Sequence, residues 1–357
     1  MKKYSGLIKE NTAPKNSRRI GVYNSSGVKI GNIKTEGLTL PDVGTKLYSF
    51  GVLSDIHLNV KSSTREDAID AKTDFQRALT YFTGTEKVDF TCICGDLTNF
   101  GKVDEYAHYK EMVETYSPNT PVYAISGNHD ATDEYQGGPS AITLTYEGTT
   151  PYTGKPLYYT FSQGNDLFVM MGIRRWVYGT SNADLFSVEE LQWLYDTLEE
   201  NRLKRCFVFQ HVLRFDGCGK PYSTAPTANM LSVEQGQVFQ SIVSHYPNVI
   251  WFHGHSHTCF DSQEDNIIAN YDRKFGCHSV HIPSLAAPKE YENSAYEAMS
   301  AESEGYVVDV YENHIVLRGR DFASGKFLPI ATYCIDTSFT AVAADTFVDT
   351  TGTLKTP

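Results

Sequence analysis

Apolar residues in the first third of the chain fall in short runs that alternate with segments of helical periodicity. The runs 47–53, 88–94 and 121–125 are typical of buried strands. Helices are predicted over 65–83 and 104–116, where apolar side chains recur every three or four residues. Alternating strands and helices favour βαβ units, in which parallel strands bring polar residues together at their carboxyl ends.

The rest of the chain is richer in strands. Ser187 and Glu190 form a capping box that opens a helix extending to about residue 201. Residues 131–156 contain several Gly and Pro and are predicted to form a long loop beside a substrate cleft. Further strands are predicted over 158–161, 167–173, 206–210, 249–252, 279–282, 305–311 and 314–318, the last two as a hairpin.

The two ends of the chain differ from the middle. Residues 1–17 are predicted to be an irregular leader and 19–33 a hairpin. The hairpin is either an extra edge hairpin or an attachment module for a larger assembly, because residues 1–45 hold eight Lys or Arg against three Asp or Glu. After residue 336 a trailing strand and a loose tail are both compatible with the Thr- and Ala-rich sequence. We therefore predict a leader with a hairpin (1–45), a main domain (46–335) and a tail (336–357).

Composition narrows the class of protein. Of the 357 residues 41% are hydrophobic and 21% charged, as in a soluble globular protein, and the net charge of -12 argues against stable nucleic-acid binding. No apolar run approaches membrane-spanning length, and the basic start lacks the apolar core of a signal peptide, so a cytoplasmic protein without membrane contact is predicted. The seven scattered cysteines are predicted to be reduced, with Cys92 and Cys94 on the buried face of one strand.

Five polar fragments, each at or near the end of an apolar run, carry the candidate chemistry. Their donors are oxygen and nitrogen atoms without thiolates, a set that suits Mn, Fe or Zn. Several such donors at strand ends indicate a two-metal hydrolytic centre. The fragments are Asp55-Ile56-His57, Gly95-Asp96-Leu97-Thr98-Asn99, Gly127-Asn128-His129-Asp130, His211 and Gly254-His255-Ser256-His257.

Each of these residues has a plain structural interpretation when taken alone. Asp55 would be a turn or cap residue, and His211 a buried histidine with satisfied hydrogen bonds; only their joint occurrence favours a site. Arg174 and Arg175 follow a strand and are either exposed surface residues or phosphate contacts. Three further histidines are predicted to be structural: His253, His278 and His281.

In their order, the fragments resemble the blocks DxH, GDxx(D/N), GNH(D/E), H and GHxH of the calcineurin-like metallophosphoesterase superfamily. The resemblance spans residues 55–257 and implies an α/β fold, a two-sheet β-sandwich flanked by helices. It implies one metal ion held by Asp55, His57, Asp96 and His257. It implies a second ion held by Asp96, Asn128, His211 and His255, with each oxygen of Asp96 serving one ion.

The same resemblance implies phosphoester hydrolysis by a hydroxide that bridges the two ions. His129 would act on the leaving oxygen, as a proton donor or as a stabiliser of charge. The protein-phosphatase branch has GDxVDRG, but here Asn99 replaces the acid and Phe100 the phosphate-binding Arg. The sequence is closer in style to cyclic-nucleotide and glycerophosphodiester phosphodiesterases, which makes Asn99 a substrate-binding candidate.

A phosphodiesterase acting on a small or nucleotide-like substrate is therefore predicted. A broad-specificity phosphomonoesterase is the alternative within the same chemistry. A scaffold that keeps the fold within a larger assembly is the alternative of another class, and residues 1–45 would then make the assembly contact.

Overall fold

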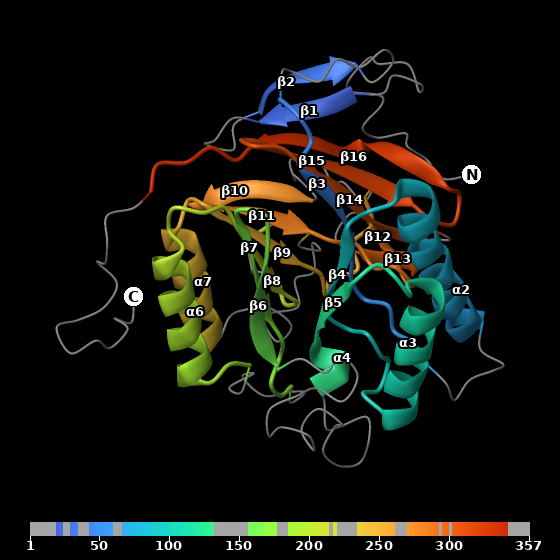
Figure 1. Ribbon diagram of the computed structural model, residues 1–357. Helices are drawn as coiled ribbons and strands as arrows, with labels where there is room; N and C mark the ends of the chain where they lie inside the picture. The colour runs from blue at the N-terminus through green and yellow to red at the C-terminus, as the bar shows by residue number, and fades with distance from the viewer. Residues whose placement is uncertain are drawn as a thin grey trace.

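Two mixed β-sheets lie face to face, with helices on the outer face of each (Figure 1). This arrangement confirms the predicted two-sheet sandwich flanked by helices. The computed structural model describes residues 19–23, 29–34, 43–59, 66–131, 156–176, 185–213, 217–219, 234–260, 270–292, 295–299 and 302–341.

The first sheet contains the fragments from the first third of the chain. Its strands are β1 (Arg19–Tyr23), β2 (Lys29–Lys34), β3 (Tyr48–Leu53), β4 (Phe90–Cys94), β5 (Val122–Ile125), β14 (Glu304–Val310), β15 (His314–Asp321) and β16 (Lys326–Asp336). Their order is β2-β1-β16-β15-β14-β3-β4-β5. Strands β3, β4 and β5 are parallel, as predicted, so their carboxyl ends lie at one edge. The predicted hairpin is present as β1 and β2, and β1 pairs in parallel with β16.

The second sheet contains the later strands. They are β6 (Tyr158–Gln163), β7 (Asp166–Met171), β8 (Cys206–Gln210), β9 (Val249–His253), β10 (Tyr271–Phe275) and β11 (Cys277–His281), in the order β10-β11-β9-β8-β7-β6. The four central strands are parallel, and the edge strands β6 and β10 are antiparallel to their neighbours. A separate two-stranded sheet is formed by β12 (Lys289–Glu292) and β13 (Ala295–Met299).

Alternation of side chains along the strands builds the layers. In β8, Phe207 and Phe209 join the core between the two sheets, whereas Cys206 and Val208 face the helices. Across the sandwich, the ring of Phe50 meets that of Phe207 edge-on at 5.4 Å between centroids. All seven cysteines are buried thiols, and Cys92 and Cys94 lie in the core between the sheets, as predicted.

Helices cover the two outer faces. They are α2 (Glu66–Thr80), the π-helical turn η1 (Tyr81–Glu86), α3 (Val103–Tyr116), α4 (Asn128–Ala131), α6 (Val188–Glu200) and α7 (Glu234–His245). Figure 1 shows α2 and α3 beside the first sheet and α6 and α7 beside the second. The predicted capping box opens α6, because Ser187 accepts a hydrogen bond from the backbone of Glu190.

Some elements were not predicted. Helix α7 and strands β10, β12, β13 and β16 have no counterpart in the expectations from sequence. In β16, Pro329 cannot donate a backbone hydrogen bond, and the pairing with β15 shifts between Arg318 and Arg320. A proline inside an apolar run argues against a strand, so β16 was not predicted from the sequence. Most of the predicted loop 131–156 lies outside the described residues.

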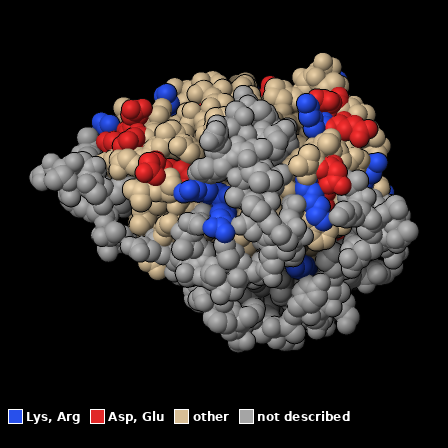
Figure 2. Space-filling view, turned by 90° about the horizontal axis from the view of Figure 1, so that it is seen from below, with Lys and Arg blue, Asp and Glu red and all other residues tan. Residues whose placement is uncertain are grey.

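The short helix α4 marks the face of the sandwich onto which the carboxyl ends of β4 and β5 open (Figure 1). Figure 2 shows this face with acidic and basic side chains interspersed over its described part rather than a continuous basic surface. Within the described residues, no helix has both the length and the apolar character needed to cross a membrane.

Candidate metal centre

The loops that carry the polar fragments leave their strands in the left-handed backbone conformation. Asp55 has φ of 54°, Asp96 of 49° and His255 of 72°, and His57 and His257 behave in the same way. Lys87 is the sole other non-glycine residue with positive φ in the described part of the chain. Such conformations cost about 1–3 kcal/mol each and persist where the surroundings over-determine them. Five of these six strained residues belong to the polar fragments, so the backbone alone already indicates a functional site here.

Two glycines explain how these loops come so close together. A Cβ on Gly127 would overlap Asp96 Oδ1 and the Asp96 backbone amide. A Cβ on Gly254 would overlap Ser54 Oγ and lie 2.5 Å from Asp55 Oδ2. Each glycine therefore permits one fragment to pack directly on the carboxylate of another, which accounts for its place next to the donor residues.

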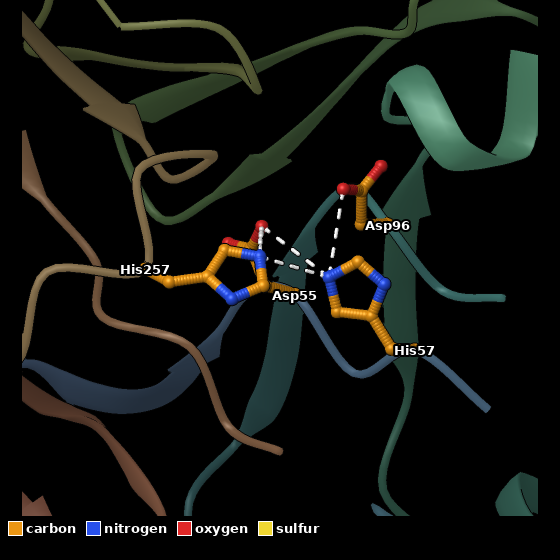
Figure 3. Close-up of side chains that lie close together, drawn as sticks. All are labelled: Asp55, His57, Asp96 and His257. Atoms are coloured by element: carbon orange, nitrogen blue, oxygen red, sulfur yellow. Dashed lines mark hydrogen bonds and ion pairs between the residues drawn. The ribbon is translucent and has the colours of Figure 1, made fainter. Parts of the chain in front are cut away.

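The first donor group consists of Asp55, His57, Asp96 and His257, whose donor atoms all lie within 4.8 Å of one another. Figure 3 shows the imidazoles of His57 and His257 pointing toward each other, with their Nε2 atoms 2.9 Å apart. Asp55 Oδ1 lies 3.1 Å from His257 Nε2, and Asp96 Oδ2 lies 3.7 Å from His57 Nε2. The four side chains come from the ends of β3 and β4 and from the loop after β9, and they converge on one point.

The second donor group consists of Asp96, His211 and His255, again within 4.8 Å. Asn128 belongs with it, since its Oδ1 lies 3.2 Å from His211 Nε2 and 2.7 Å from His255 Nδ1. An amide oxygen is a metal donor of the same kind as a carboxylate oxygen. All seven donor residues singled out in the sequence are thus brought together in two adjacent groups.

Asp96 is the residue common to both groups. Its Oδ2 lies 3.7 Å from His57 Nε2 and 3.2 Å from His211 Nε2. Its Oδ1 accepts a hydrogen bond of 2.8 Å from the backbone amide of His129. This differs from the expectation that each oxygen serves one ion, because a single oxygen faces both groups and the other is used to hold the carboxylate in place.

The imidazoles are oriented for metal binding by their other nitrogens. His211 Nδ1 donates to the carbonyl oxygen of Cys94 at 2.7 Å, and His257 Nδ1 donates to that of Ala287 at 3.1 Å. In both rings the Nε2 lone pair then faces the donor group, which is the usual arrangement of metal-bound histidine. Asp55 Oδ1 is buried without a hydrogen-bond partner, so it has an unmet need for a cation or a proton. The residues present fit metal ions.

Charge in this buried site is balanced by the facing groups. Burial alone would raise the pKa of Asp55, but His257 and His211 hold it well below its usual range. Burial opposes the charged form of His211, yet Asp96 and Asp55 raise its pKa to about 9. His255 behaves in the opposite way, since burial and the neighbouring His211 lower its pKa to about 3. Without metal, Asp55 is therefore ionised, His211 carries a proton and His255 is neutral.

His129 lies beside the first group. Its ring meets that of His57 edge-on, with centroids 4.5 Å apart, and its Nδ1 donates to the backbone carbonyl of Asn99 at 2.9 Å. The side chains of His129 and Asn128 diverge, since Asn128 turns to the second donor group. For Asn99 the structural role is that of its backbone, which orients His129; substrate binding by its side chain stays a prediction.

Asp130 is a residue of the site whose role the sequence did not reveal. Its buried carboxylate accepts hydrogen bonds from the backbone amides of Leu97, Thr98 and Gly127 at 2.8–3.0 Å. It thereby ties the loop that carries Asp96 to the loop that carries Asn128. The sequence did contain a hint of this role. Asp130 is the last residue of Gly127-Asn128-His129-Asp130, and the family block GNH(D/E) also ends in an acid.

Lys289 is a second residue of the site that was missed. Its backbone amide donates to His257 O at 2.7 Å, and its carbonyl accepts from the Cys259 amide at 3.0 Å. Burial lowers the pKa of the half-buried Lys289, while Asp55 and Asp96 act in the opposite direction, so its ammonium lies within electrostatic reach of both carboxylates. The sequence offered no signal, because Lys289 is 32 positions beyond the nearest fragment (289 against 257).

The two arginines considered from sequence lie after β7. The charge of Arg174 acts on Glu190 at the start of α6, where it lowers a carboxyl pKa that burial raises. Arg175 is exposed. For Lys289, by contrast, the neighbouring charges of Asp55 and Asp96 favour the charged form and raise its pKa against the effect of burial.

Two facing β-sheets with carboxylate and imidazole donors clustered at strand ends form the layout of metal-dependent phosphoester hydrolases. The sequence matches the calcineurin-like phosphoesterase family over residues 48–259 of 357, and the chain belongs to that family. The resemblance drawn from the five fragments is thereby confirmed.

One solved structure supports the fold. A purple acid phosphatase from yellow lupin (Lupinus luteus) seeds superposes with a TM-score of 0.54 at 13% identity, covering 85% of this chain and 56% of that one. This chain thus spans little more than half of that relative. Wild-type Vps29 complexed with zinc, from Entamoeba histolytica, gives a TM-score of 0.34 at 11% identity, over 81% of this chain and 99% of that one. No curated protein matches the sequence.

Proposed function

We propose that the protein is a binuclear metal-dependent phosphoesterase that hydrolyses a phosphodiester of a small or nucleotide-like substrate. The observation that carries the proposal is the shared position of Asp96, whose Oδ2 faces two adjacent donor groups. One ion would be held by the first group, and a second by Asp96, His211, His255 and Asn128. Mn, Fe and Zn all suit such oxygen and nitrogen donors.

The metal ions and the protein side chains would have different roles in the proposed reaction. Two cations would supply an activated water nucleophile and neutralise charge on the phosphoryl oxygens. The residues of this chain orient the reactants: Asp96 spaces the two groups, and His129 stands beside the first group to act on the leaving oxygen. The Nδ1 of His129 donates to the carbonyl of Asn99, which orients the ring, and we propose that the ring exchanges a proton with the leaving oxygen through Nε2.

The preference for diesters rests on charge. A monoester dianion gains more than a diester monoanion from a fixed guanidinium, and Phe100 stands where protein phosphatases have that Arg. Asn99 can donate a hydrogen bond to a phosphate without adding negative charge. Lys289 supplies a single ammonium near the centre, in place of the planar two-pronged guanidinium that grips a terminal phosphate. Discrimination is therefore expected to be modest.

The test combines metal analysis with paired substrates. We expect two equivalents of bound metal per chain after Mn reconstitution, and a higher kcat/KM for bis(p-nitrophenyl) phosphate than for p-nitrophenyl phosphate at mildly alkaline pH. Asn99→Asp should be slower on both, because it places a negative charge beside the phosphate. A strong preference for the monoester would favour the broad phosphomonoesterase instead. Full metal occupancy without hydrolysis of either ester would favour the scaffold.

The ends of the chain enter the proposal as separate parts. We take residues 46–335 as the catalytic domain, 1–45 as a leader and hairpin available for assembly, and 336–357 as a tail. The hairpin lies at one edge of the first sheet, and β5, which leads to the donor residues, lies at the opposite edge. This position supports an accessory role for the hairpin. A chain starting at residue 46 should keep its metal content and its kcat/KM, while sedimentation should show whether assembly is lost.

A further inference from the structure

Ser256 lies between the two histidines of the loop that serves both donor groups. Its hydroxyl oxygen is 2.8 Å from Nε2 of His281, on the neighbouring strand β11. Ser256 is 7% exposed and His281 0%, so this hydrogen bond has no competition from bulk water. The bond connects the loop to the rigid sheet beneath it through a side chain that is not a donor to either group.

His281 is itself held on three sides. Its Nδ1 lies 3.2 Å from Asn270 Oδ1, and its backbone amide donates to Asn270 O at 3.0 Å. A Cβ on Gly219 would overlap the imidazole ring, so the bare backbone of Gly219 closes off one face of the ring. Because an amide oxygen accepts, Nδ1 carries the proton and Nε2 accepts from the Ser256 hydroxyl. Burial lowers the pKa of His281 to about 3, which keeps the ring in this neutral form.

Thr258 extends the same network. Its hydroxyl lies 3.0 Å from Ser256 Oγ and donates to the carbonyl of Gly219 at 2.9 Å. The segment between Ser256 and Thr258 is therefore tied down at both ends. His257, with φ of 59°, lies between these two anchored residues, and His255, with φ of 72°, directly precedes Ser256. Strained backbone of this kind reverts when the contacts that hold it are removed.

We propose that His281 is a positioning residue of the metal centre, which holds Ser256 and thereby fixes the spacing between His255 and His257. The inference rests on the proposed function, because it assigns a task toward the metal ions of that site. His281 acts on both ions at once, since the two histidines of the loop belong to different donor groups. It goes beyond the prediction from sequence, which gave His281 a structural role.

The test uses the two nitrogens of the ring separately. Asn in place of His281 can reproduce Nδ1 and its bond to Asn270, whereas Gln can reproduce Nε2 and its bond to Ser256. We expect His281→Asn and Ser256→Ala each to weaken Mn binding about 10-fold, at the lower end of the losses seen when partners of metal ligands are removed. His281→Gln should bind within about 3-fold of wild type. The double variant His281→Asn, Ser256→Ala should be no weaker than either single variant.

His278 provides the matched control. It lies on the same strand, is 1% exposed, and bonds to the Tyr271 hydroxyl at 3.0 Å rather than to the loop. His278→Asn should lower the unfolding temperature but leave Mn affinity unchanged. Affinity is measured by titration calorimetry on metal-free protein, and the spacing of the two ions by the exchange coupling in Mn electron paramagnetic resonance.

The outcomes separate the inference from the function on which it rests. If wild type binds two Mn ions and His281→Asn binds them equally well, the inference is overturned and the proposed function stands. Equal losses in His281→Asn and His278→Asn would also overturn it, because a general loss of stability would then explain both. A wild-type protein that binds no Mn would overturn both proposals.

Discussion

Asp96 Oδ1 accepts a hydrogen bond of 2.8 Å from the backbone amide of His129. This contact holds the carboxylate with Oδ2 toward both donor groups and ties the backbone of His129 to Asp96, while the carbonyl of Asn99 orients the His129 ring. The residue that joins the two groups and the residue proposed to act on the leaving oxygen are thus positioned by each other. The first two predictions test the two sides of this relationship separately.

Asp96→Asn should abolish hydrolysis and lower the metal content below two ions per chain. The substitution keeps the shape of the side chain but removes the negative charge shared between two cations, while the His129 contact is preserved. Elemental analysis and activity after dialysis against Mn measure the effect. Asp309→Asn is the control, since Asp309 is a buried acid paired with Lys46 and Arg318 away from the centre; a fully active, fully loaded Asp96→Asn protein would contradict the assignment.

His129→Ala should keep both metal ions and lose rate by roughly 10²–10⁴-fold, the usual contribution of a general acid. The loss should shrink for esters with very good leaving groups, because these need little protonation as they depart. A series of aryl esters of increasing phenol pKa measures this. An equal loss across the series would mean that His129 is structural.

Lys289→Ala should raise KM for phosphoesters and weaken inhibition by inorganic phosphate, with metal content unchanged. When cations occupy the site, they engage the charges of Asp55 and Asp96, and we expect the positive charge of Lys289 then to attract the substrate anion. We expect about a 10-fold change, the scale of one charge-assisted hydrogen bond. Lys289→Arg should restore most of the affinity, and Arg175→Ala is the control because that arginine is exposed; an effect confined to Arg175→Ala would reverse the assignment.

Metal affinity should rise with pH. Asp96 and Asp55 raise the pKa of His211 to about 9 in the metal-free protein, above the value near 6.5 of an unfolded chain. The charged ring therefore stabilises the metal-free fold fully below about pH 6.5, and this contribution is lost as the pH rises through about 9. Because the ring must lose its proton to bind a metal, Mn affinity should increase up to about tenfold per pH unit between pH 7 and 9.

Calorimetry in buffers of different ionisation enthalpy counts the protons released on Mn binding at each pH. We expect close to one additional proton at pH 7 compared with pH 10. If the number of protons released is the same at pH 7 and pH 10, His211 is already neutral in the metal-free protein.

Asp130→Asn should destabilise the fold and loosen the site together. One oxygen that accepts backbone amides becomes a donor, so at least one buried amide is left without an acceptor, at a cost of about 1–3 kcal/mol. Urea unfolding measures the loss of stability, and Mn titration should show weaker binding because the loops of Asp96 and Asn128 are no longer tied together. Unchanged metal affinity with lowered stability would limit Asp130 to a structural role.

Local patterns in the sequence determined much of this protein. Apolar runs separated by helical periodicity predicted the parallel strands β3, β4 and β5, because burial on both faces leaves a continuous apolar signature. Polar fragments at strand ends indicated a metal centre, since parallel strands present their carboxyl ends at one edge. Which seven residues would be its donors was implied by the resemblance to the calcineurin-like blocks. The capping box of α6 could be predicted because it is complete within four consecutive residues.

Contacts between distant segments were decided only by the tertiary structure. The bond from Ser256 to His281 spans 25 positions, and that from Asp96 to His129 spans 33. Nothing in the neighbourhood of Lys289 or His281 distinguishes them in the sequence from an ordinary strand residue. Their roles come from the pairing of β11 with β9 and from the contact of Lys289 with the His257 loop. A sequence records which donors are present, whereas the folded backbone decides which oxygen of Asp96 faces both donor groups, because rotamers are set by partners brought in from elsewhere in the chain.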